Sequence, residues 1–165
     1  MWRSRLTIPM MLGLCLLALA ACGPLSSGTI AQAQVPPAAP GMARVWFLRA
    51  SLSPQFGAVQ AFSPMIYANG APVAAITAGT GFYRDFAPGA YRFTVQPFGL
   101  PTPQATTIAL APGTQAYLQV DWVASWTQGY PPASWDFKPN TFAILEMAPQ
   151  LAQAYLPSLG YLGGR

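Results

Sequence analysis

Histidine is absent from this 165-residue sequence, and aspartate and glutamate together number only four. The missing histidines remove the side chain that most often acts as a general base or binds a transition metal. A glycosidase would need two carboxylates about 5 to 9.5 Å apart, and the sequence leaves open a pair such as Asp121 with Asp136. Catalysis is therefore not expected, and neither a metal site nor a cofactor is predicted.

Cysteine occurs only at positions 15 and 22, and the residues before Cys22 have the three parts of an export signal. Arg3 and Arg5 supply a basic start, an apolar stretch follows, and small residues close it. A membrane-spanning helix needs about 20 apolar residues, whereas this stretch is shorter and contains Pro9 and Gly13. We therefore expect a cleaved signal peptide over residues 1–21 rather than a permanent transmembrane anchor.

The tetrapeptide Leu19-Ala20-Ala21-Cys22 resembles the lipobox of bacterial lipoproteins, in which a leucine and two small residues precede an invariant cysteine. The resemblance implies that a diacylglycerol is attached to the Cys22 thiol, that the chain is cut before this residue, and that the new amine is usually acylated. Two or more acyl chains form a stable anchor, since each buried methylene contributes about 0.8 kcal/mol. A competing secretory cleavage at Ala31-Gln32-Ala33 lies far beyond the apolar stretch and would leave Cys22 unexplained.

The residue after the cysteine is Gly23, not aspartate. In an organism with two membranes, this resembles the pattern of lipoproteins sent to the outer membrane. The expected location is the cell envelope, with the protein facing the periplasm. The lipid bilayer is the expected partner through Cys22, whereas the scattered basic residues of the mature chain argue against nucleic acid.

Residues 22–42 are rich in proline, alanine, serine, glycine and glutamine, and we expect a disordered linker there. Fully extended, such a linker would reach about 60 Å. The folded domain is then expected over residues 43–165. Its mature chain keeps a single cysteine, so an intramolecular disulfide is excluded.

Short segments of alternating apolar and polar residues predict an all-β fold. Asn69-Gly70 predicts a tight hairpin, and Pro88-Gly89 and Pro112-Gly113 predict type II turns between antiparallel strands. A short helix is expected over residues 149–159. Its Leu151, Ala154 and Tyr155 are spaced to share a face. The strands are expected over residues 43–49, 65–68, 72–76, 82–86, 91–95, 106–110, 117–122 and 142–147, so the fold class is a small antiparallel β-sandwich with a C-terminal helix.

The order of these motifs resembles an uncharacterised small β-domain of bacterial lipoproteins, which is similar in outline to transthyretin-like and PEGA-type sandwiches. The resemblance covers about residues 43–122, and it implies no catalytic residues. The chain departs from the pattern in a proline-rich insertion over residues 53–64 and in an aromatic segment over residues 122–137. The resemblance depends on Arg44-Val45-Trp46-Phe47-Leu48-Arg49, Ile66-Tyr67-Ala68-Asn69-Gly70, Gly81-Phe82-Tyr83, Phe86, Pro88-Gly89 and Tyr91.

Three side chains of the aromatic segment, Trp126, Tyr130 and Trp135, are the candidate binding residues. Aromatic rings stack on sugars and anchor protein partners with little loss of conformational entropy. In the alternative interpretation, Trp122 and Phe137 belong to the core and the segment between them folds over the edge of the sandwich.

These observations favour a membrane-anchored envelope lipoprotein that acts as a non-enzymatic interaction or structural module. A glycan- or peptidoglycan-binding module that uses the Trp126 to Trp135 segment is the alternative. An envelope hydrolase is a third hypothesis, which would require two close carboxylates in a cleft. A protein or glycan of the envelope is therefore the expected partner besides the bilayer.

Overall fold

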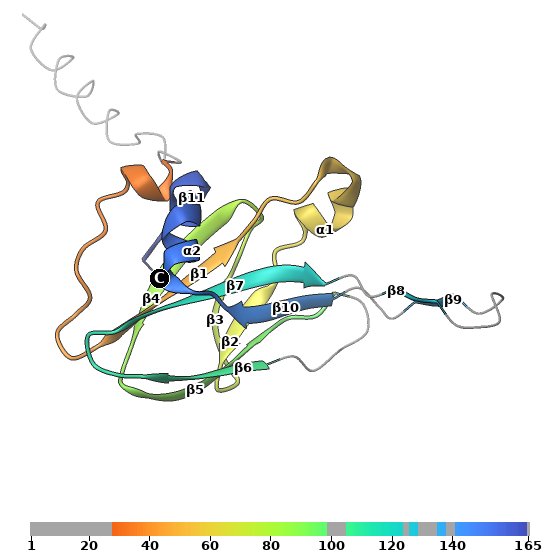
Figure 1. The fold of residues 1–165 in the computed structure, drawn as a ribbon. Coiled ribbons are helices and arrows are strands. Elements are labelled where there is room, and N and C mark those ends of the chain that lie inside the picture. The colour runs from red at the N-terminus through yellow and green to blue at the C-terminus, as the bar shows by residue number, and fades with distance from the viewer. Residues whose placement is uncertain (1–27, 99–104, 124–125, 129–134, 138–140, 165) are drawn as a thin grey trace, which may run out of the picture.

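The computed structural model describes residues 28–98, 105–123, 126–128, 135–137 and 141–164. Two sheets pack face to face, as Figure 1 shows, and this confirms the predicted β-sandwich with a short C-terminal helix. The five-stranded sheet has the order β10 (Thr141–Glu146), β7 (Gln115–Val123), β1 (Ala43–Arg49), β4 (Thr80–Phe86) and β11 (Gly160–Gly164). The four-stranded sheet has the order β3 (Ala71–Ala75), β2 (Met65–Ala68), β5 (Gly89–Val95) and β6 (Ala105–Leu110).

Short helices and one small ribbon complete the fold. A third, two-stranded sheet pairs β8 (Trp126–Gln128) with β9 (Trp135–Phe137). The helical elements are η1 (Ile30–Gln32), η2 (Pro54–Phe56), α1 (Gly57–Ala61), α2 (Pro149–Tyr155) and η3 (Leu156–Ser158). Among the residues that the structure describes, none of these helices is long and apolar enough to cross a bilayer.

Strand β1 lies at the centre of the five-stranded sheet, and all seven of its residues are buried. Val45 and Phe47 point into the core between the sheets, where the Phe47 ring lies 5.0 Å from the ring of Phe82. Trp46 and Leu48 point the other way, into a second apolar cluster on the outer face of this sheet. The strand therefore has two apolar faces.

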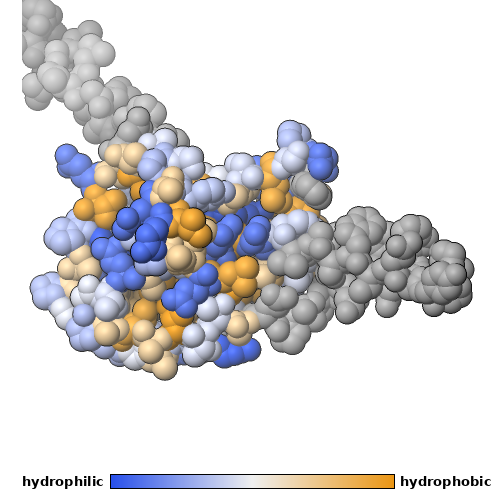
Figure 2. Space-filling model, in the orientation of Figure 1, coloured by the Kyte–Doolittle hydropathy of each residue, from blue (hydrophilic) through white to orange (hydrophobic). Residues whose placement is uncertain are grey.

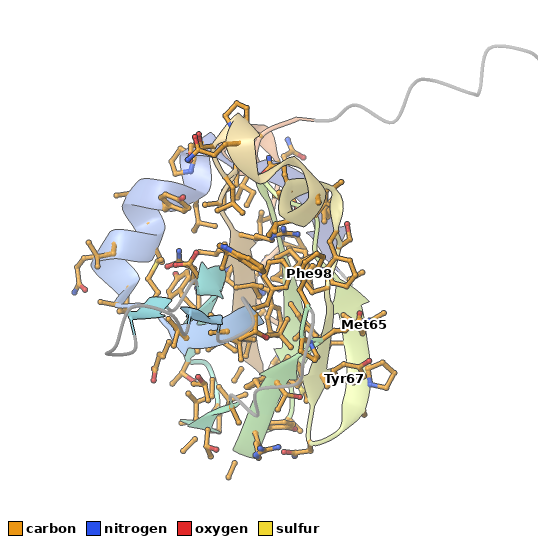
Figure 3. All side chains as sticks on the ribbon, turned by 90° about the vertical axis from the view of Figure 1, so that its right-hand side faces the viewer. Met65, Tyr67 and Phe98 are labelled. Atoms are coloured by element: carbon orange, nitrogen blue, oxygen red, sulfur yellow. The ribbon has the colours of Figure 1, made fainter. Side chains whose placement is uncertain are left out.

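One end of the sandwich core is closed by aromatic packing. The ring of Phe98 lies 5.3 Å from that of Phe62 and 5.5 Å from that of Trp122, and Figure 3 shows its place beside the sheets. On β2, half-buried Met65 and Tyr67 alternate with buried neighbours, so they lie on the outer face of the four-stranded sheet. Trp122 is thus packed on the core, as the alternative interpretation expected.

The predicted hairpin at Asn69-Gly70 is confirmed. Asn69 and Gly70 have φ angles of 50° and 83°, the left-handed values that a tight type I′ turn requires at both positions. The Asn69 side-chain oxygen also accepts a hydrogen bond of 2.8 Å from the Arg92 backbone N–H. This turn therefore joins β2 to β3 and also fixes β2 beside β5.

The two predicted Pro-Gly hairpins are wrong, because each Pro-Gly pair connects strands of different sheets. Gly113 has a φ of 74°, and the Thr114 N–H donates to the Ala111 carbonyl at 3.2 Å, so a type II turn is present between β6 and β7. Gly89 has a φ of 153°, far from the value near 80° that this turn requires. A turn sets local backbone angles, whereas burial of the following strand determines which sheet it joins.

The C-terminal helix is shorter than predicted and is rotated about its axis. It ends at Tyr155, because Pro157 cannot continue the helical hydrogen bonds. Ala152 is its buried residue. Leu151 is 65% exposed and Ala154 is exposed, so the predicted face is wrong for these two residues, whereas Tyr155 packs against the second apolar cluster as expected. The chain then adds β11, whose glycine-rich sequence gives little indication of a strand.

Residues 28–39 lie along the outer face of the five-stranded sheet, and we call them the strap (orange in Figure 1). The Ile30 side chain is 7% exposed and joins the second apolar cluster, and its N–H donates to the Leu159 carbonyl at 2.9 Å. The Tyr161 N–H donates to the Gly28 carbonyl at 3.0 Å. From residue 28 onward, the segment expected to be a linker is therefore in contact with the folded domain.

Candidate functional sites and the two buried arginines

Of the site residues predicted from sequence, Cys22 and Tyr130 lie outside the described residues. Trp126 and Trp135 lie on β8 and β9, which form a ribbon beyond the ends of β7 and β10 in Figure 1. Trp126 pairs with Phe137, and Gln128 pairs with Trp135. Because residues alternate between the faces of a strand, positions 126, 128, 135 and 137 share one face of this ribbon.

The carboxylates are dispersed over the fold. Asp121 on β7 accepts a hydrogen bond of 2.8 Å from the N–H of its neighbour Trp122, and Glu146 is exposed at the end of β10. Asp136 pairs with Thr127 in the ribbon register. Within the described part of the chain, no group of three acidic, cysteine or histidine residues is arranged to hold a metal ion.

The fourth carboxylate, Asp85 on β4, forms an ion pair with Arg44 on β1. The Arg44 Nε donates to Asp85 Oδ1 at 2.7 Å, and Nη2 donates to Oδ2 at 2.9 Å. The Arg44 side chain is 4% exposed and that of Asp85 is 21% exposed. Hydrogen bonding to the guanidinium holds the pKa of Asp85 below its usual value, and the same hydrogen bonding raises the pKa of Arg44.

The Arg44 guanidinium also binds the strap. It donates to the backbone carbonyls of Pro36 and Pro37, and its central carbon lies 3.8 Å from the centre of the Tyr83 ring. Burial, together with a hydrogen bond to Tyr83, raises the pKa of the nearby Tyr161 to about 12. The Arg44 cation thus joins β1, β4 and the strap, and Tyr161 of β11 stacks on Tyr83 beside it.

Arg49, at the other end of β1, is 2% exposed and binds backbone carbonyls. Its Nη2 donates to the Val59 carbonyl at 2.8 Å, and its Nη1 donates to the carbonyls of Phe62 at 2.5 Å and Ile76 at 3.1 Å. Its guanidinium carbon also lies 4.7 Å from the centre of the Phe142 ring. Burial lowers the pKa of Arg49. The insertion over residues 53–64 is therefore held to the sandwich by a buried cation.

Sequence reasoning did not single out either arginine, although the signal was present. Arg44 and Arg49 flank the apolar run of β1, and charged residues at both ends of a buried strand require specific partners. Asp85 pairs with Arg44, which lies far away in the sequence. Its partner could not be identified, because register between distant strands is not visible in local sequence.

No protein-family model matches this chain, and no curated protein matches it. The resemblance to bacterial lipoproteins therefore depends on the residues of the chain itself. Cys22 remains the residue with the clearest predicted chemistry.

Proposed function

We propose that this protein is a lipid-anchored cell-envelope lipoprotein whose β-sandwich is a non-enzymatic interaction or structural module. Leu19-Ala20-Ala21-Cys22, at the end of an apolar stretch with a basic start, is the observation that carries the proposal. In an organism with two membranes, Gly23 favours the outer membrane, with the domain in the periplasm.

The use of charged side chains supports the non-enzymatic part of the proposal. Asp85 forms an ion pair with Arg44, and Arg49 donates hydrogen bonds to backbone carbonyls. Asp121, on the strand β7 next to the edge strand β10, accepts a hydrogen bond from the backbone N–H of Trp122. These groups have structural partners, whereas a catalytic acid or base needs to be available to a substrate.

Metabolic labelling with a clickable fatty acid tests the anchor in cells of a bacterium that processes lipoproteins. The native chain should be labelled and should sediment with membranes, and Cys22→Ser should lose the label. Cys15→Ser is the matched control, because this thiol lies inside the predicted signal peptide and should leave labelling unchanged. Membrane binding by an unlabelled native chain would contradict the proposed anchor.

A turnover assay tests the non-enzymatic role. Purified Cys22→Ser protein should not hydrolyse peptidoglycan or other envelope polymers. Asp121→Asn and Glu146→Gln are the informative variants, because neither carboxylate belongs to the Arg44 ion pair. Turnover by the parent protein that disappears in one of these variants would instead support the hydrolase hypothesis.

Binding to glycan is the second candidate function, and the ribbon register favours it. Trp126, Trp135 and Phe137 share one face of β8 and β9, which extend beyond the strands they connect. Several aromatic residues on one face of a ribbon are typical of surfaces that bind sugars by ring stacking. In this case the sandwich would be the support, and the ribbon would contact peptidoglycan.

A further inference from the structure

The strap is fixed to the domain at its first described residues. The Gly28 carbonyl accepts from Tyr161, and the Ile30 N–H donates to Leu159. Thr29 forms a β-bridge with Gly160, and the Ile30 side chain is buried against the outer face of the sheet. Residue 28, the first described residue, is therefore held at the end of β1 that carries Arg49.

The rest of the strap runs back along β1 toward Arg44. There the Pro36 and Pro37 carbonyls accept from the Arg44 guanidinium, and the Ala39 N–H donates to Asp85 at 3.3 Å. The strap is thus held at both ends. Composition alone predicts a linker of about twenty residues. The attached strap leaves only six residue steps, from Cys22 to Gly28, between the proposed anchor and the domain.

Chain geometry limits how far the domain can lie from the anchor. An extended chain spans at most about 3.6 Å per residue, so Gly28 can lie no more than about 22 Å from Cys22. A free linker as far as residue 42 would reach at most about 70 Å by the same geometry, or about 60 Å at the rise of about 3.1 Å per residue of a proline-rich chain. The attached strap therefore shortens the reach of the domain more than threefold.

The described segments around Gly28, which form the Gly28 end of the domain, carry no charged side chain. Residues 28–33, 77–80 and 156–161 meet there and contain no Asp, Glu, Lys or Arg. Arg49 lies nearby but is buried, and half-buried Asp121 lies on β7, two strands away from β4, whereas Arg44 and Asp85 lie toward the opposite end. Figure 2 shows hydrophilic and hydrophobic residues intermingled on the face in view. An uncharged end can approach lipid headgroups without desolvating a charge.

We infer that the strap holds the domain at the membrane surface, with the uncharged Gly28 end toward the lipid and the Pro112-Gly113 turn away from it. This inference rests on the proposed acylation of Cys22. The bilayer surface is the partner of the Gly28 end. The opposite end, together with the outer face of the four-stranded sheet, is presented to the periplasm.

Energy transfer to the membrane tests this orientation. One dye is placed on Thr77→Cys, which is exposed near Gly79, whose carbonyl accepts from the Gly160 N–H. In a second protein the dye is placed on Ala111→Cys, which is exposed next to the Pro112-Gly113 turn. The acylated protein is reconstituted in phosphatidylethanolamine and phosphatidylglycerol vesicles that contain acceptor-labelled headgroups.

The native tether should give at least twofold stronger transfer from position 77 than from position 111, because β1 alone separates the two ends by about 23 Å. A matched variant carries about fifteen Gly and Ser residues inserted between Ser26 and Ser27, which lengthens the tether and leaves the strap sequence intact. In this variant the difference between the two positions should disappear. Equal transfer from both positions with the native tether would overturn the inference.

Two further measurements separate this inference from the proposed function. The mass of the purified protein reports acylation of Cys22, and an unacylated cysteine overturns both proposals. Acylation with equal transfer overturns only the orientation. In soluble Cys22→Ser protein, the Ile30 and Tyr161 amides should exchange with deuterium at least tenfold more slowly than the same amides in an unstructured peptide, and rapid exchange would overturn the strap attachment without reference to lipid.

Discussion

Arg44 and Asp85 are directly opposite each other on β1 and β4, and their side chains meet through two parallel hydrogen bonds of 2.7 and 2.9 Å. The same guanidinium donates to the carbonyls of Pro36 and Pro37, and the same carboxylate accepts from Ala39. A single ion pair therefore connects the centre of the sheet to the strap. Removing either partner affects both elements.

Asp85→Asn should lower the free energy of unfolding by about 2 kcal/mol at neutral pH, because it leaves the buried Arg44 cation without its counter-charge. Urea denaturation measures this change. Asp121→Asn is the matched control, since this carboxylate accepts from the N–H of its own neighbour. A difference below about 0.5 kcal/mol between the two variants would contradict a structural role for the ion pair.

The contribution of Asp85 to stability should depend on pH. Its pKa in the folded state lies below the ordinary value near 4, because the Arg44 guanidinium stabilises the carboxylate. The stabilisation is then complete above the unfolded-state pKa and is lost as the pH falls through the lower folded-state pKa. The difference in unfolding free energy between the native protein and Asp85→Asn should therefore shrink below about pH 4. A difference that is constant from pH 7 to pH 2 would contradict this linkage.

Replacing Arg49 should loosen the inserted segment before it affects the rest of the fold. Arg49→Met removes the donors to three carbonyls, those of Val59, Phe62 and Ile76, and should destabilise the protein by about 3 kcal/mol. Hydrogen exchange should accelerate most over residues 57–62. Uniform acceleration across the domain would show that Arg49 stabilises the whole sandwich instead of fixing this segment.

Two glycines provide a matched test of the hairpin turn. Gly70 has a φ of 83°, and Gly70→Ala should cost about 1 kcal/mol because an alanine is strained there although the surrounding space is open. Gly57 also has open space around it but a φ of −49°, so Gly57→Ala should stabilise the protein by about 0.5 kcal/mol. Thermal denaturation of both variants measures the signs. Equal effects would mean that the left-handed angle at Gly70 is unimportant.

Glycan binding can be tested on the ribbon. If the second candidate function is correct, Trp126→Ala with Trp135→Ala should reduce retention on insoluble peptidoglycan at least tenfold, since each stacked ring contributes about 1 kcal/mol. Tyr67→Ala is the control, because it removes an aromatic residue from the outer face of the other sheet. Unchanged retention in the double variant would exclude the ribbon as the binding surface.

The sequence predicts local structure well in this protein, because the alternation of apolar and polar residues along a strand indicates directly which side chains are buried. Phe93 and Val95 are buried as their alternation predicts, and Asn69-Gly70 forms the turn that its residues favour. The assignment of strands to sheets was not predictable in the same way. A Pro-Gly pair fixes backbone angles at the turn but carries no information on which distant strand the chain meets next.

The strap and the buried arginines illustrate the same limit. Ile30 lies in a segment with no periodic pattern, and its partner Leu159 is far along the chain. Arginine is usually a surface residue, so residue type alone does not indicate that Arg44 and Arg49 are buried. They have specific partners because they lie on a strand that is buried on both faces. The candidate sites Cys22 and Trp126 were identified from residue chemistry, and their roles remain predictions.

The position of β1 also determines when this protein can fold. Its two neighbours, β4 and β7, come later in the chain, so Arg44 can pair with Asp85 only after about half of the sequence has been made and with Gln115 only after about two thirds. Contacts between such distant residues make folding slow, because large loops must close before they are stabilised. For a chain that we propose crosses a membrane, this delay keeps the polypeptide unfolded while it is threaded through a translocation channel. If the chain is exported as proposed, this late pairing of the central strand favours translocation before folding.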